Sequence, residues 1–87
     1  MARVFNIYFL FDDTMYNAIV SVRTTPFFTE YTLTNYNESL DQHLPSNKII
    51  SKSPEHFMFQ NVTTESSEAL MKAIINAVSE HLQMMKA

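Results

Sequence analysis

The C-terminal stretch of residues 64–85 carries a continuous helical pattern and contains neither proline nor glycine. Thr64 can cap its first turn, because a threonine hydroxyl accepts a hydrogen bond from an unpaired amide there. At about 100° per residue, one face collects the apolar side chains of Met71, Ile74, Ile75, Val78, Leu82 and Met85. The stretch therefore predicts an amphipathic helix of about six turns, which must cover another apolar surface.

A second band of small or apolar residues runs beside that face. It consists of Ala69, Leu70, Ala73, Ala77, His81 and Met84. Alanine is the best helix former, so one interpretation is a half-exposed flank without further use. The other is a contact surface, because alanines at every fourth position let a second backbone approach closely. We call these six residues the alanine band. They are the candidate interaction site of the chain, and both interpretations stay open.

The preceding sequence reads as strands. Apolar and polar residues alternate with the period of a half-buried strand over most of it. Strands are predicted at residues 4–11, 15–23, 27–35, 48–52 and 56–60, with a short helical turn at residues 37–44. Short connections make neighbouring strands antiparallel. Residues 1–87 therefore predict a single α+β domain: an antiparallel sheet of four to five strands with one long C-terminal helix on one face.

The inward faces of these elements define an expected core. Alternation places Phe5, Ile7 and Phe9 on one side of the first strand. The full predicted core is Phe5, Ile7, Phe9, Val20, Leu33, Phe57, Phe59, Ile74, Val78 and Leu82. The opposite side of the sheet still carries Val4, Tyr8, Leu10, Ile19, Ile50 and Met58.

The chain contains no glycine and no cysteine. Backbone positions with positive φ must therefore be filled by asparagine or aspartate, the residues that tolerate this region best after glycine. Glycine-rich phosphate loops are excluded. A disulfide framework and a thiolate metal site are excluded as well.

Charge and hydropathy narrow the class of partner. The net charge is −3, and basic residues are scattered, so we expect no nucleic-acid binding. The apolar run Val4–Phe11 is too short to span a bilayer, so no membrane partner is expected. A cytoplasmic location is the default that remains.

Candidate catalytic or metal-binding groups are few. Asp12 and Asp13 are adjacent in a predicted turn, and Asp41 and His43 lie two residues apart, so they do not share a helix face. A histidine that acts as general base needs a nucleophile and an orienting partner within reach. The sequence pattern places neither beside a histidine. We therefore predict no catalytic residues, no metal and no cofactor.

The overall layout is similar to that of short, uncharacterised bacterial proteins. The similarity rests on the aromatic, alternating N-terminal hairpin, the middle segment from Glu38 to Asn61 and the C-terminal amphipathic helix. It implies the same strand-rich body with a terminal helix. It implies no activity and no site residues.

The geometry of the predicted layers suggests a function. Five strands about 4.8 Å apart make a sheet wider than one helix of about 10 Å, and the helix has a wide apolar arc. A two-fold interface between two copies would cover both the part of the sheet that the helix leaves open and the part of the helix arc that the sheet does not use. We therefore expect a small non-enzymatic interaction module that forms a homodimer. We choose the alanine band as its interface, because a flank without long side chains permits close helix approach, and the outer sheet face with Tyr8 and Leu10 is the alternative interface. The alternative is a protein that binds an apolar small molecule between helix and sheet.

Overall fold

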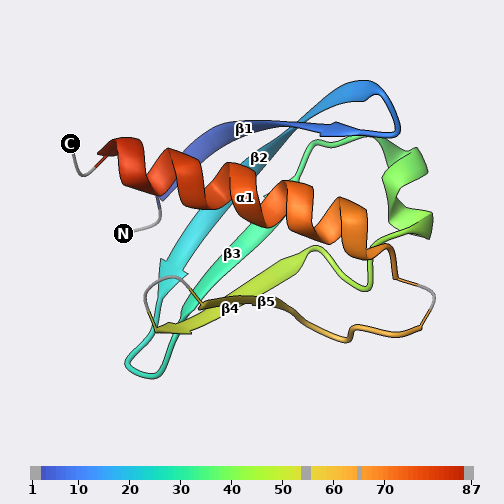
Figure 1. Ribbon diagram of the computed structural model, residues 1–87. Coiled ribbons are helices and arrows are strands. Elements are labelled where there is room, and N and C mark those ends of the chain that lie inside the picture. Colours follow the sequence, from blue (N-terminus) through green and yellow to red (C-terminus); the bar gives the residue numbers. More distant parts are fainter. Residues whose placement is uncertain (1–2, 54–55, 65, 86–87) are drawn as a thin grey trace.

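The computed structural model describes residues 3–53, 56–64 and 66–85, and it places five strands in one antiparallel sheet (Figure 1). Sheet order follows chain order, so each strand pairs with the next. The strands are β1 (Arg3–Phe11), β2 (Thr14–Thr24), β3 (Thr29–Thr34), β4 (Lys48–Ser53) and β5 (His56–Phe59). A short 3₁₀ helix, η1 (Glu38–Gln42), follows β3, and the long helix α1 (Glu68–Met85) comes last. The predicted α+β fold class is confirmed, with five strands.

The turns use the residue types that a chain without glycine requires. Four described residues have a positive φ angle, and they are Asp12, Asp13, Asn35 and Asn61. Asp12 and Asp13, with φ of 53° and 61°, form the whole connection between β1 and β2. Two successive positive φ values twist a two-residue turn in the sense that the flanking strands need. The expectation for asparagine and aspartate is therefore confirmed.

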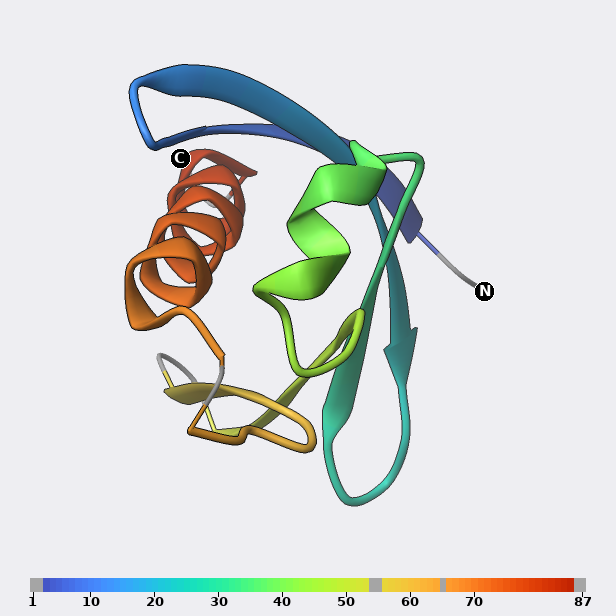
Figure 2. The same cartoon turned by 90° about the vertical axis from the view of Figure 1, so that its right-hand side faces the viewer.

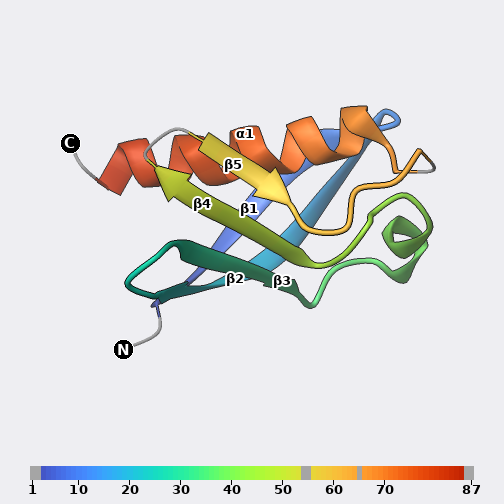
Figure 3. The ribbon, with the colours of Figure 1, turned by 90° about the horizontal axis from the view of Figure 1, so that it is seen from below.

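The sheet curls around α1 instead of lying flat beneath it. Figure 2 shows α1 on the concave side, between the β1–β2 hairpin and the β4–β5 pair, with η1 beside it. Figure 3, seen from below, shows β5 running under α1. Each strand of a sheet is twisted relative to its neighbour, and the twist that accumulates over five strands produces this curl. One helix was expected to be too narrow for the inner face, but curling brings the two edges toward α1 (Figure 2), and the inward residues of the sheet are buried.

The concave side holds the hydrophobic core. Cross-strand pairing aligns Ile7 with Ala18, and Val20 with Leu33, so inward side chains form continuous rows across the sheet. Of the predicted core, Ile7, Phe9, Val20, Leu33, Phe59, Ile74 and Val78 are buried, whereas Phe5, Phe57 and Leu82 are half-buried against it. Leu40 of η1 and Ile49 of β4 are almost completely buried as well, and the core also contains Ala18, Val22, Tyr31 and Leu70.

The buried face of α1 differs from the predicted one. Its centre is formed by Leu70, Ile74 and Val78, which are at most 1% exposed. Ile75 and Leu82 were predicted on the apolar face, and Leu82 in the core, but both are only half-buried. The helix is thus rotated so that part of the alanine band turns toward its own sheet, because the curled sheet contacts more of the helix circumference than a flat one.

The helix also begins later than predicted. It starts at Glu68, and Ser67 caps it in place of Thr64. Ser67 Oγ accepts a hydrogen bond from the amide of Leu70 at 3.2 Å, and its carbonyl accepts from the amide of Met71 at 3.0 Å. The amide of Ser67 donates to the carbonyl of His43 at 2.8 Å, which ties the helix start to η1. A serine hydroxyl satisfies a first-turn amide as well as a threonine does, so Ser67 takes the role that was predicted for Thr64.

Candidate interaction surface

Four of the five large apolar side chains that are exposed in the described strands lie together on the outer face of the β1–β2 hairpin. Alternation along β1 points Ile7 and Phe9 inward and therefore Val4, Tyr8 and Leu10 outward. Met15 of β2 lies directly opposite Leu10. Val4, Tyr8, Leu10 and Met15 are 62%, 67%, 58% and 64% exposed, and we name them the β1 stripe. Large exposed apolar areas on a small protein are typical of contact surfaces.

Sequence reasoning placed Val4, Tyr8 and Leu10 on this face but did not include Met15. The length of the turn between the two strands indicates where Met15 lies. A two-residue connection at Asp12 and Asp13 pairs Phe11 with Thr14, and the next pair is then Leu10 with Met15. The register of the hairpin could therefore have been predicted from the sequence alone.

The two edges of the sheet differ in how far they are protected. β1 has nine residues, contains no proline, carries its single charge at Arg3, and pairs with β2 without a register shift. β5 has only four residues, and its pairing with β4 is irregular between Ile50 and Ser53. Short edge strands, bulges, prolines and charges are the usual devices that prevent an edge from pairing with another chain. β5 has two of these devices, whereas β1 is long and regular.

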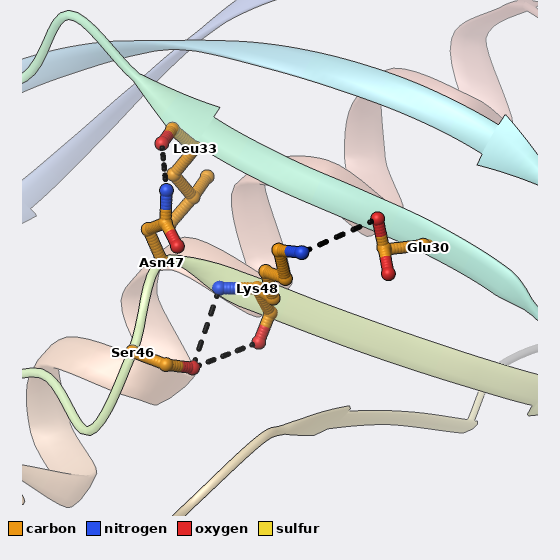
Figure 4. Close-up of polar contacts among 5 residues, drawn as sticks. All are labelled: Glu30, Leu33, Ser46, Asn47 and Lys48. Atoms are coloured by element: carbon orange, nitrogen blue, oxygen red, sulfur yellow. Dashed lines mark hydrogen bonds and ion pairs between the residues drawn. The ribbon is translucent and has the colours of Figure 1, made fainter.

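A polar region lies on β3 and β4, between the hairpin that carries the β1 stripe and β5 at the other edge of the sheet. Figure 4 shows its contacts. Lys48 Nζ lies 3.9 Å from Glu30 Oε1, and the Glu30 side chain is only 17% exposed. Close by, Asn47 Nδ2 donates a hydrogen bond to the carbonyl of Leu33 at 3.1 Å, which extends the contact between β3 and β4 beyond Lys48. These contacts occupy the middle of the sheet, so the apolar areas on either side are separate.

An open depression lies on the far side of this polar region. It encloses about 500 Å³ and is lined by Phe28, Ile50, Lys52, Met58, Phe59, Gln60 and Asn61. Ile50, expected on the open outer face, is 9% exposed between Glu30 of β3 and Met58 of β5, its partners in the sheet. Met58 is 60% exposed, as expected. The depression offers a small apolar surface with Lys52 as its one cation.

The predicted interaction band on α1 does not form one exposed surface. Ala69 is exposed, whereas Leu70 is completely buried in the core of its own chain. Ala73 and Ala77 are half-buried and pack against that core. The described alanines therefore leave a narrower strip to a partner than the sequence suggested.

The remaining members of the band are His81 and Met84. The ring of His81 stacks on Phe5 of β1, with centroids 4.1 Å apart and planes 5° from parallel. His81 thus joins the end of α1 to the sheet. The side chain of Met84 lies outside the described part of the structure.

Several of the polar groups considered for chemistry have structural roles. Asp12 and Asp13 form the β1–β2 turn, as predicted. Asp41 Oδ1 accepts a hydrogen bond from the hydroxyl of Tyr36 at 2.7 Å. Desolvation, this hydrogen bond and the Asp41 charge raise the pKa of Tyr36 to about 12. Within the described residues, no three histidine or acidic side chains converge as a metal site would require.

Comparison with protein-family models, curated proteins and solved structures found no match for this chain. The similarity to short bacterial proteins therefore stays an expectation from the sequence. Among the described residues, no helix has both the length and the apolar character needed to cross a membrane.

Proposed function

We propose that this protein is a small non-enzymatic interaction module that self-associates. The observation that supports the proposal is the β1 stripe: four large apolar side chains, each more than half exposed, on one side of one hairpin. Removing such side chains from water stabilises a complex by roughly 25 cal/mol per Å² of buried apolar surface before the costs of association.

The outer sheet face is a better candidate for the interface than the alanine band of α1. Leu70, the largest described aliphatic side chain of the band, is already buried inside its own chain. Ala73 and Ala77 are partly used in the same way. The β1 stripe has no such intramolecular use, so its apolar surface is available to a partner.

The alternative, an apolar ligand between helix and sheet, gains no support from the described residues. Side chains of Leu40, Leu70, Ile74 and Val78 fill that space, and each is at most 1% exposed. The depression near Met58 lies on the opposite face of the sheet. The cytoplasmic location, and the absence of a nucleic-acid partner expected from the net charge of −3, stay predictions.

Molar mass by light scattering tests the proposal. Wild type at about 100 μM should have the mass of a dimer, because this concentration populates dimers with micromolar dissociation constants. Leu10→Lys should shift the mass toward the monomer, because it places a charge in the apolar contact. Ala69→Lys is the matched control on the exposed side of α1, and it should leave the dimer intact.

The outcomes are distinct. A wild type that stays monomeric contradicts self-association. A dimer that resists Leu10→Lys but dissociates with Ala69→Lys places the interface on the helix. Both substitutions are at exposed positions, so circular dichroism should show the same fold in all three proteins.

A further inference from the structure

We infer that the partner is a second copy of this chain, which pairs antiparallel with β1 at its free edge and continues the sheet across a two-fold axis. The inference rests on the proposed self-association and specifies its geometry. It depends on three features of β1: an open edge, opposite charges at its two ends, and a self-complementary face.

The free edge of β1 has no backbone hydrogen-bond partner within the described part of the chain. β1 is the first strand of the sheet and pairs on one side only, with β2. The helix α1 contacts β1 through side chains on the inner face, as in the stacking of His81 on Phe5. No backbone hydrogen bond joins β1 to any described segment other than β2. Its outward amides and carbonyls can therefore accept another strand.

The charges at the ends of β1 favour an antiparallel second copy. Arg3 begins the strand, and Asp12 and Asp13 follow its last residue. Neither Arg3 nor the two aspartates forms an ion pair with another described residue. Antiparallel pairing brings the Arg3 end of each copy to the aspartate end of the other, whereas parallel pairing brings like charges together. Such complementarity sets orientation more than it adds affinity.

The alternation of side chains restricts the register. Paired residues must point to the same face, because a slip of one residue exchanges the inner and outer faces. Centring the two-fold axis on Ile7 satisfies this rule and pairs all nine residues of β1 with the second copy. Val4 then lies opposite Leu10 of the second copy, and Leu10 opposite Val4. The exposed aliphatic residues of the β1 stripe thus meet across the interface in two symmetric pairs.

Disulfide trapping tests this register, and the chain has no cysteine of its own to interfere. Val4→Cys and Leu10→Cys are made as separate proteins, since both side chains are exposed and should tolerate the change. They are mixed in equal amounts under mild oxidation, and the products are identified by intact mass. Directly opposed residues have Cα atoms about 5 Å apart, within the range that a disulfide bridges.

The mixture should yield mainly the disulfide-linked dimer of the two different variants. Each variant alone should stay unlinked, because its own thiols lie about 20 Å apart along the paired strands. The matched control mixes Asn6→Cys with Leu10→Cys, which would be opposed only if the register slipped by two residues. This control should give little linked dimer.

Light scattering of the reduced mixture separates the two ways in which the result could be negative. A dimer that forms without the disulfide between positions 4 and 10, or with the control disulfide in its place, overturns the β1 register and leaves the proposed self-association standing. A reduced mixture that is monomeric at all concentrations overturns both.

Discussion

The hydroxyl of Tyr36 joins the end of β3 to η1 through its 2.7 Å hydrogen bond to Asp41. Its pKa is raised from 10.0 to about 12, so the folded state favours the protonated phenol. Any stability gained in this way is present below pH 10 and is lost as the pH rises toward 12. Tyr36→Phe should therefore make unfolding less dependent on pH in this window. Chemical denaturation at a series of alkaline pH values measures the difference.

Asp41→Asn is the control for the cause of this shift. Asparagine keeps an oxygen that accepts the hydrogen bond and removes the negative charge. The pKa of Tyr36, followed by tyrosinate absorbance against the Tyr36→Phe background, should fall in Asp41→Asn. An unchanged pKa would mean that burial and the hydrogen bond produce the shift without the Asp41 charge.

Single residues were predictable where the chain had few choices. Without glycine, a turn with positive φ has to use asparagine or aspartate, and Asp12, Asp13, Asn35 and Asn61 do so. The bond between Tyr36 and Asp41 was not predictable. It depends on how η1 folds back beside the end of β3, and nothing in the local sequence pattern fixes that geometry.

Among the elements, α1 shows that a sequence pattern can predict a helix without predicting which of its sides is buried. The existence of the helix followed from its periodicity, but the sheet decides which side is buried. The sequence favoured Leu82 over Leu70 for the core, whereas Leu70 is 0% exposed and Leu82 is only half-buried. The curl of the sheet accounts for the rotation, and curl accumulates from the twist of many strand pairs that no local pattern specifies.

Leu70→Ala and Leu82→Ala test this orientation with the same chemical change. Leu70→Ala should lower the free energy of unfolding by about 2–5 kcal/mol, because it leaves a cavity in the core. Leu82→Ala should cost clearly less, since that side chain already has solvent on one side. Urea denaturation gives both values. A larger loss at Leu82 would restore the face predicted from sequence.

At the scale of the whole molecule, the two sheet edges have opposite character. The apolar residues of the outer face could be named from alternation alone, and the exposure of Val4, Tyr8, Leu10 and Met58 agrees with it. The contrast between a regular β1 and a short, irregular β5 could not, because it depends on strand lengths and register. The proposed self-association through β1 would bring the open edge and the exposed aliphatic residues of β1 into one interface.

Amide hydrogen exchange at two protein concentrations tests whether two copies pair through the edge of β1. At the concentration that gives a dimer by light scattering, amides of β1 should exchange more slowly than in the dilute monomer, because the second copy pairs with their free edge. Amides of β5 serve as the internal control and should exchange at the same rate in both samples. A dimer in which β1 exchange is unchanged, while α1 becomes protected, would contradict the account.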